Sequence, residues 1–482
     1  MQTHRFDPDS YFAGKLIDRS RPLSFRFNRR LYYGYEGDSL FTALRANGVS
    51  EVAIGTSTRF SFDKETARKI LVKQVKLESA ALPMDELTIT DGMELEQVPA
   101  PTLTQKVFRR LALGSNVLVV NDSEGTRAKN PYSQPTNHAS CDVAVIGGGI
   151  AGMQAALSAA SSGENVVILE STNRLGGMSD YYGKAEDDQD PTELIKSLSD
   201  QVSSHPSISV CVGHTAVDVR GNTIEIEYPQ QNDEAVSQLE FGKLVIASGA
   251  ENSRAFASGQ EPAGLLKAVD TFRLAMDYGI KPSEPLNVFS GGNSGYRLAY
   301  LLSEAGLQVE NIWDPRIGAS SRHIDFAKAI GLKIQQGRSA HQFERKGGKL
   351  QTVIQSPFDR VGQNLQRSFE NVIVSDAPIP NTFLWSRAGG RVAFDEARQA
   401  FYPVGNSQNL EIVGSAAGAI TQSECLAQAN ALFGNKSSKV GKLGQYKYED
   451  PAAALGFDES DGFIAGIRAQ ANVPQFVGLP QR

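Results

Sequence analysis

The most regular pattern of apolar and polar positions lies between residues 142 and 177. An apolar run over residues 143–146 enters a glycine-rich turn, and a helix of small residues then leads to a second apolar run over residues 166–169. This order predicts a strand, a turn, a helix and a parallel strand, which together form the βαβ unit of dinucleotide-binding folds. We therefore expect an α/β protein that contains such a unit.

Three glycines in this turn have the spacing that binding of a diphosphate requires. Gly147 permits the tight turn, Gly149 lets the backbone approach the diphosphate, and Gly152 lets the helix pack closely on the sheet. Glu170 follows the second strand, where its carboxylate can accept hydrogen bonds from the ribose hydroxyls and repel a 2′-phosphate. The pattern predicts a site for an adenine dinucleotide and disfavours NADP.

A second pattern of the same kind begins near residue 286. A strand over residues 286–289 enters a Ser-Gly-Gly-Asn-Ser-Gly turn, and a helix and a strand over residues 309–313 follow. Ser290 stands where the first glycine of a dinucleotide turn belongs. We expect a Rossmann-like fold with an empty or altered crevice here, and whether it binds a second ligand stays open.

Residues 21–110 carry a different pattern. Alternating apolar residues over 23–27 and a turn at 28–30 predict a hairpin, and Ser39 then caps a helix over residues 40–46. A hairpin followed by a helix is how a β-grasp, ferredoxin-like domain begins. The first cysteine of the chain is Cys141, so this domain cannot hold an iron–sulfur cluster.

The predicted architecture is two tandem Rossmann-like domains, arranged as in disulfide reductases, after the small β-grasp domain. A chain of 482 residues is long enough for this number of cores. The expected boundaries are residues 1–20 for an N-terminal arm, 21–110 for the β-grasp domain, 111–140 for a linker, 141–280 and 376–435 for the first dinucleotide-binding domain, 281–375 for the inserted second domain, and 436–482 for a C-terminal tail.

Composition and charge argue against several classes of protein. The net charge is −6 and no block of Lys and Arg could follow a phosphate backbone, so we expect no nucleic-acid partner. We expect neither a signal peptide nor a membrane span, because no apolar run is long enough. The three cysteines form no CxxC pair, which indicates a reducing, cytoplasmic location.

Further candidate cofactor-binding residues flank the first turn. Small residues after a strand that ends near residue 413 predict a helix whose N-terminus meets a diphosphate. For Arg174, a contact to adenine or phosphate and a structural role are equally compatible with the sequence. Besides the three turn glycines and Glu170, the predicted set comprises Ile150, Ala151, Ser171, Arg174, Gly176, Gly177, Ser248, Gly249 and Gly414.

The sequence shows neither a catalytic constellation nor a metal site. The six histidines are scattered, and the acidic run over residues 186–190 is predicted to be a solvated loop. This does not argue against redox function, because a flavin or a nicotinamide carries that chemistry itself.

Several short segments resemble the α subunit of heterotetrameric sarcosine oxidase and its relatives among opine oxidases, amino-acid dehydrogenases and hydrogen cyanide synthases. Each segment alone is short, but they occur in the order of that family. They cover residues 21–25, 37–49, 293–297, 314–316, 389–395 with 401–403, and 413–418.

The resemblance implies a set of cofactors and partners. It implies NAD or FAD on Gly147, Gly149 and Gly152, an FAD-containing β subunit that oxidises the amine, small further subunits, and an FMN between α and β. Ser415 stands where many flavoproteins have an aspartate at the ribityl chain, which weakens the case for FAD. We expect the family's aminomethyltransferase-like half, and with it the transfer of one-carbon units to folate, to be missing.

Three functions remain as alternatives. We favour a nucleotide-binding α subunit of a heteromeric flavin-dependent oxidoreductase whose partner oxidises a small secondary amine or amino acid. The others are a self-sufficient FAD/NAD(P)H-dependent oxidoreductase and a non-catalytic scaffold stabilised by its dinucleotide. The missing CxxC pair disfavours disulfide reduction, and the altered second turn disfavours rapid NAD(P)H turnover.

Overall fold

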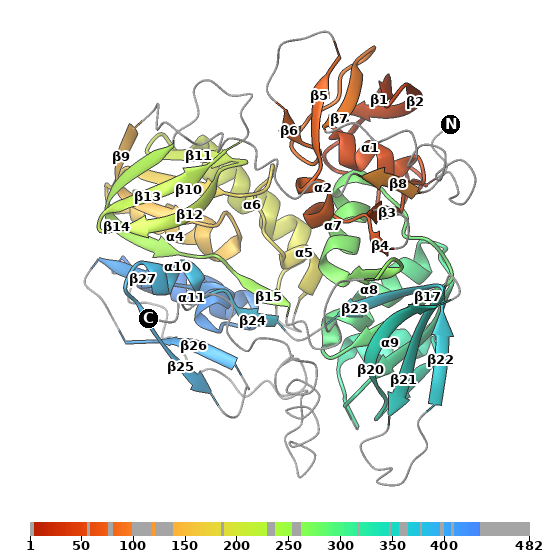
Figure 1. Cartoon of the computed structure of the whole chain (residues 1–482). Coiled ribbons are helices and arrows are strands. Elements are labelled where there is room, and N and C mark those ends of the chain that lie inside the picture. Colours follow the sequence, from red (N-terminus) through yellow and green to blue (C-terminus); the bar gives the residue numbers. More distant parts are fainter. Residues whose placement is uncertain are drawn as a thin grey trace, which may run out of the picture.

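A computed structural model describes most of the chain, and Figure 1 shows its three groups of helices and strands. None of the helices in the described ranges is long and apolar enough to cross a bilayer. The predicted C-terminal tail and most of the predicted linker lie outside these ranges. The described residues are 4–54, 58–75, 81–98, 117–120, 138–184, 188–228, 237–252, 262–316, 318–346, 349–355, 365–375, 378–395, 400–405 and 409–433.

The N-terminal unit contains a sheet with the strand order β2-β1-β7-β5-β6. Asn28 and Arg29 adopt positive φ and close the β1–β2 hairpin, while β1 also pairs in parallel with β7. This parallel pair beside a hairpin is the β-grasp arrangement that the sequence predicts. Its elements are β1 (Asp18–Phe27), β2 (Arg30–Glu36), α1 (Leu40–Ala46), α2 (Lys64–Arg68), β5 (Leu71–Gln74), β6 (Leu82–Pro83) and β7 (Glu94–Val98).

A second, smaller sheet completes this unit. It consists of β3 (Glu51–Ile54), β4 (Thr58–Ser61) and β8 (Val117–Val120), in the order β4-β3-β8. The strand β8 falls within residues 111–140, the range predicted as a linker, yet it is buried and pairs in parallel with β3. The N-terminal unit therefore extends to residue 120.

The first dinucleotide-binding unit is built on a mostly parallel sheet in the order β11-β10-β9-β14-β13-β12, with β27 also paired to β14. Small residues of α4 pack against this sheet and form one core with α6 and α11. The elements are β9 (His138–Ile146), α4 (Ile150–Ser161), β10 (Val166–Glu170), α5 (Ser179–Tyr182), α6 (Pro191–Ser204), β11 (Ile208–Val212), β12 (Thr215–Arg220), β13 (Thr223–Glu227), β14 (Gln238–Ile246), β27 (Leu410–Ile412) and α11 (Gln422–Ala431).

The inserted unit has a parallel sheet in the order β16-β23-β17-β18-β19 and an antiparallel sheet β20-β21-β22. The chain enters it through β15 (Ala250–Asn252) and returns through β24 (Pro378–Pro380), which pair with each other. These two sheets confirm the predicted pair of Rossmann-like units, but β16 and α7 belong to the second unit, so it begins before the predicted residue 281. Its elements are β16 (Leu265–Lys267), α7 (Ala268–Tyr278), β17 (Leu286–Ser290), α8 (Asn293–Glu304), β18 (Val309–Asp314), α9 (Arg322–Ala329), β19 (Ile334–Gln336), β20 (Ser339–Lys346), β21 (Lys349–Gln355), β22 (Leu365–Phe369) and β23 (Asn371–Ser375).

After the return, α10 (Phe383–Arg387) and a hairpin of β25 (Arg391–Asp395) and β26 (Ala400–Val404) precede β27. Trp385 of α10 is buried against the first unit's sheet and donates its indole N–H to the Arg391 carbonyl at 2.8 Å. This segment therefore belongs to the first unit, beside β12 and β14 in Figure 1.

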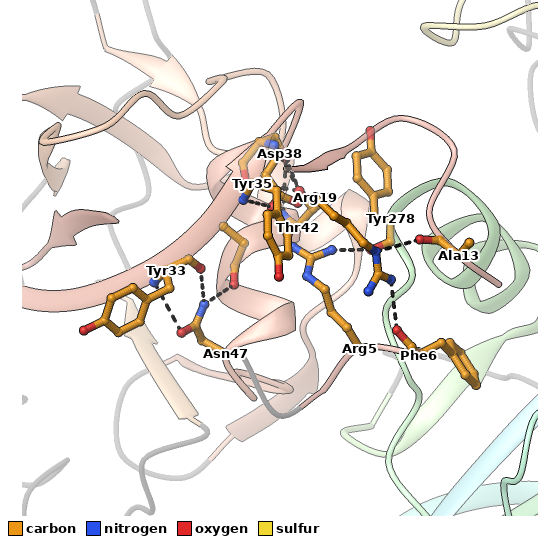
Figure 2. Close-up of polar contacts among 12 residues, drawn as sticks. Arg5, Phe6, Ala13, Arg19, Tyr33, Tyr35, Asp38, Thr42, Asn47 and Tyr278 are labelled. Atoms are coloured by element: carbon orange, nitrogen blue, oxygen red, sulfur yellow. Dashed lines mark hydrogen bonds and ion pairs between the residues drawn. The ribbon is translucent and has the colours of Figure 1, made fainter. Parts of the chain in front are cut away.

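The segment before β1 joins the N-terminal unit to the inserted unit. Phe6 and Phe12 are buried in the core of the inserted unit, where Phe12 contacts Phe272 of α7. Arg5 donates to Asp38 at 2.6 Å across this boundary and also to the Tyr278 carbonyl, as Figure 2 shows. The predicted arm is therefore a packed connector between two units.

A second contact joins the N-terminal unit to the first dinucleotide-binding unit. Arg68 Nη2 lies 2.6 Å from Glu227 Oε1 and 3.7 Å from Glu86 Oε1. Burial and the neighbouring Asp85 carboxylate raise the pKa of Glu86 from 4.5 to about 7. The folded chain thus binds a proton at Glu86 more tightly than the unfolded chain does.

This shift predicts a stability that depends on pH. The contribution of Glu86 is complete below its unfolded pKa of 4.5 and is lost as the pH rises through about 7. In thermal unfolding, we expect the midpoint of the wild type to fall more than that of Glu86→Gln between about pH 6 and about pH 8. Glu240→Gln, on an exposed position of β14, should behave as the wild type does. Parallel curves for the wild type and Glu86→Gln would contradict the prediction.

Candidate functional site

A cavity of about 670 Å³ lies between the first unit and the inserted unit, a size typical of cofactor and ligand sites. The first unit contributes the turn after β9, the end of β10, the segment from Gly177 to Lys184, and the residues between β27 and α11. The inserted unit contributes the start of α7 and the start of α8. The cavity thus begins at the predicted dinucleotide turn and ends against the second Rossmann-like unit.

The three turn glycines are required for different reasons. Gly147 has a φ of +105°, and a Cβ there would lie 2.3 Å from the Ala247 carbonyl oxygen. A Cβ on Gly152 would lie 1.9 Å from the Gly147 carbonyl oxygen, so this glycine allows α4 to pack against the turn. A Cβ on Gly149 would be 3.8 Å from its nearest protein atom, in Gly177. Of these three glycines, Gly149 is therefore the one that the protein's own packing needs least.

The start of α4 has the electrostatics of an anion site. Gly149 is its N-cap and, among the described residues, no side chain caps the helix. Ile150 and Ala151 of the first turn line the cavity. The N–H groups of a helix's first turn have no partner within the helix, and the positive end of the helix dipole favours a diphosphate there. These residues lie where the sequence places the diphosphate.

Glu170 is held at the cavity wall by three hydrogen bonds. Gly148 N–H donates to its Oε2 at 2.8 Å, and the N–H and hydroxyl of Thr172 donate to its Oε1 at 2.6 and 2.7 Å. A carboxylate has about four acceptor positions, so about one is left for a ribose hydroxyl. Its 6 % exposure and its place in the cavity wall fit this role.

Gly177 of the Gly176–Gly177 pair and the turn at Ser248 and Gly249 also reach the cavity, whereas Gly176 is not part of its wall. Gly176 N–H donates to the Gly148 carbonyl at 2.9 Å, which ties the second glycine pair to the first turn. Ser248 Oγ donates to the Asn381 carbonyl at 2.8 Å, and Gly249 has a φ of +76°. Ser171, Gly177, Ser248 and Gly249 line the cavity.

Arg174 has a structural role. Its Nε lies 2.7 Å from Asp277 Oδ1 and its Nη2 lies 3.2 Å from Asp180 Oδ2, and it is not part of the cavity wall. Because Asp277 belongs to α7, Arg174 ties the first unit to the inserted unit. The structure therefore favours the second of the two roles considered for this residue.

The helix predicted to start at Gly414 is absent from the described structure. Residues Gly414–Ala417 form a single 3₁₀ turn, and α11 begins only at Gln422. Its first N–H groups are occupied, because Asp188 accepts from the N–H groups of Gln422 and Ser423, and Thr421 Oγ1 accepts from Glu424 N–H. Asp188, from the acidic run predicted as a solvated loop, is thus a helix cap.

Gly414 nevertheless lies at the site. Its φ is +72°, and a Cβ there would lie 2.7 Å from the Ala151 side chain in the first turn of α4. Its N–H donates to Gln428 Oε1 at 2.8 Å. Gly414 therefore borders the diphosphate position through packing and not through a helix dipole.

Two titratable side chains in the wall were not expected from the sequence. Burial and the nearby guanidinium groups of Arg297 and Arg322 lower the pKa of His323 to about 3, so this histidine is neutral at physiological pH. Burial raises the pKa of Cys425 to about 12, so it remains a thiol. His323 is therefore a poor base and Cys425 a poor nucleophile near neutral pH in this state.

The inserted unit supplies further wall residues that were not among the predicted cofactor-binding residues. They are polar or charged and line the cavity. The sequence marks two of them only as part of the altered second turn, and the others carry no local motif that could have marked them. They are Lys267, Asp270 and Arg273 of the β16–α7 segment, Asn293 and Ser294 of α8, and His323 of α9.

Residues 141–389 match the family model described as pyridine nucleotide-disulphide oxidoreductase, which covers the glycine turn, Glu170 and the inserted unit. The chain belongs to this family. Its structure is also similar to a crystal structure of L-proline dehydrogenase from P. horikoshii, with a TM-score of 0.61 and 14 % identity over 89 % of this chain and 74 % of that one. At this identity the similarity shows a shared fold.

Curated relatives confirm the resemblance seen in the sequence. The sarcosine oxidase α subunit of Rhizobium meliloti (strain 1021) is 25 % identical over 471 residues, which is 86 % of this chain and 46 % of the relative. An opine oxidase subunit of Agrobacterium tumefaciens (strain Ach5) is 26 % identical over 297 residues, which is 55 % of this chain and 57 % of the relative. The chain spans about half the length of these relatives.

Proposed function

We propose that this chain is the nucleotide-binding α subunit of a cytoplasmic, heteromeric flavin-dependent oxidoreductase whose partner subunit oxidises a secondary amine or an amino acid. The observation that carries the proposal is the cavity in which the uncapped start of α4 faces the carboxylate of Glu170. The names of the relatives, sarcosine oxidase and opine oxidase subunits, support the substrate class.

The residues present fit an adenine dinucleotide, either NAD or FAD. The first-turn amides of α4 beside Gly149 would hold the diphosphate, and Glu170 would hold the ribose. When bound, such a group supplies hydride or electron transfer. An FMN between this chain and an FAD-containing β subunit belongs to the same proposal.

The side chains of the cavity wall support a role in binding more than one in chemistry. His323 is a poor base because of its low pKa, and the high pKa of Cys425 keeps it a thiol. The chain's own contribution would be to bind the cofactor, orient it and exclude water. The oxidation of the amine is therefore assigned to the partner.

The test is to purify the chain alone and together with the product of a neighbouring gene, and to analyse each preparation after denaturation. We expect mass spectrometry to find one adenine dinucleotide per chain, and amine oxidation only when the partner is present. A chain that releases no adenylate would refute the proposal. A yellow monomer that NADH reduces would instead support a self-sufficient oxidoreductase.

A further inference from the structure

The inserted unit repeats the geometry of the first turn with different side chains. β17 and β18 pair in parallel as β9 and β10 do, and Asp314 ends β18 as Glu170 ends β10. In a Rossmann-like unit, an acid at this position holds the ribose of a bound nucleotide. Glu170 lines the cavity, whereas Asp314 is fully buried and lies outside the cavity wall.

The carboxylate of Asp314 is already saturated with donors. The backbone N–H and Nε of Arg316 donate to Oδ1 at 2.8 and 2.9 Å, and Nη2 donates to Oδ2 at 2.8 Å. The hydroxyl of Tyr296 adds a fourth bond, to Oδ2 at 2.6 Å. A ribose could reach this carboxylate only by breaking a buried ion pair, which would weaken binding by roughly a hundredfold or more.

Two polar groups of the turn before α8 are also occupied, although α8, like α4, has no side-chain cap among the described residues. Ser290 Oγ donates to the Gly292 carbonyl at 2.5 Å, and Gly291 N–H donates to the Ser375 carbonyl at 2.7 Å. These groups bond to the protein's own backbone and are not offered to a phosphate. The occupied groups of this turn and the saturated carboxylate of Asp314 together indicate that the protein's own side chains fill the crevice of the inserted unit.

Arg316 also fixes the orientation of the Asn293 side-chain amide. Arg316 Nη1 donates to Asn293 Oδ1 at 3.0 Å, which fixes the orientation of the amide and leaves Nδ2 as a donor. Among the described residues, Nδ2 has no hydrogen-bond partner, although Asn293 is only 4 % exposed and lines the cavity. A buried donor without a partner is costly, so it calls for a ligand or an ordered water.

Building on the function proposed above, we propose that Arg316 permanently fills the crevice of the inserted unit and holds Asn293 so that its Nδ2 donates to a carbonyl oxygen of the dinucleotide bound by the first unit. The first turn and Glu170 take the diphosphate and the adenosine, so α8 faces the other half of the ligand. The carboxamide of nicotinamide and the isoalloxazine of FAD both carry such an oxygen there. The chain then binds one dinucleotide, in a site to which both units contribute.

The test uses the full purified chain, stripped of its ligand, and titrates it calorimetrically with NAD⁺, FAD and ADP-ribose. Asn293→Asp keeps the acceptor for Arg316 and removes the donor. We expect it to bind NAD⁺ or FAD, whichever the wild type holds, about tenfold or more weakly. ADP-ribose, which lacks the ring, should bind unchanged. Ser303→Ala, at the other end of α8, should match the wild type with every probe.

A second variant guards against a change in folding. If Asn293→Asp lowers the unfolding midpoint, Asn293→Ala should still weaken binding of the full dinucleotide by roughly 2- to 10-fold and leave ADP-ribose unaffected.

Equal losses of affinity for the full dinucleotide and for ADP-ribose, or no loss for either, would overturn the proposal. So would a wild-type chain that binds a second adenine nucleotide at millimolar NAD⁺. A wild type that binds none of the three probes would overturn the proposed function as well, which separates the two failures.

Discussion

Gly149→Ala should weaken binding of the adenine dinucleotide by about 1–3 kcal/mol, or roughly 5- to 150-fold in Kd, and leave the fold unchanged. Gly149 has an ordinary φ of −72°, and an added Cβ would be 3.8 Å from the nearest protein atom. The methyl group would instead occupy the space through which the backbone approaches the diphosphate. Calorimetric titration of the stripped chain and its thermal unfolding midpoint would measure the two quantities separately.

Two neighbouring glycines serve as controls for this experiment. Gly147→Ala would place a Cβ 2.3 Å from a backbone oxygen at positive φ, and Gly152→Ala would place one 1.9 Å from a backbone oxygen. Both should lower the free energy of unfolding by more than about 2 kcal/mol. If Gly149→Ala bound the dinucleotide as tightly as the wild type, the diphosphate could not lie at this turn.

Arg5→Ala should lower the free energy of unfolding by about 3–5 kcal/mol, because it leaves the Asp38 carboxylate buried without its cation. The two side chains are 3 % and 0 % exposed, and Asp38 also accepts from Tyr35 N–H and the Thr42 hydroxyl, each at 2.8 Å. This network, drawn in Figure 2, crosses from the N-terminal unit to α7 through the Tyr278 carbonyl. Denaturant unfolding would measure the loss.

Arg21→Ala is the matched control for this substitution. Arg21 pairs with Glu36 at the same distance of 2.6 Å, but the two side chains are 64 % and 54 % exposed. Its loss should cost no more than about 1 kcal/mol. Equal effects of the two substitutions would show that the Arg5 pair does not hold the units together.

Features set by local sequence could be predicted. The glycine turn, its flanking strands and the helix between them follow from residues close together in the chain. Likewise, α1 covers the residues that the sequence predicts as a helix, and Ser39 is its cap as expected. The error at residue 414 has a local cause. The small residues there favour a helix, but Gly414 and Gly418 both have positive φ. The true helix start is marked by Thr421 and Glu424, which form a capping box.

Features set by distant residues could not be predicted. Arg174 is neutralised partly by Asp277, and the wall opposite the glycine turn comes from α7, α8 and α9 of the inserted unit. No spacing in the sequence indicates that Asn293 or His323 lies against the first unit. The strand β8 could not be recognised because it contains only Val117–Val120, and its partner β3 lies far earlier in the chain.

The packed connector before β1 has a consequence for how the chain is made. Phe6 and Phe12 are synthesised before the β-grasp sheet, yet the α7 surface that buries them is synthesised only after that whole sheet and most of the first dinucleotide-binding unit. Domains generally fold in order from the N-terminus during translation. Phe6 and Phe12 can therefore become buried only after the inserted unit has been synthesised. Deletion of these two residues would expose aromatic surface on the inserted unit rather than on the β-grasp domain that follows them in the chain.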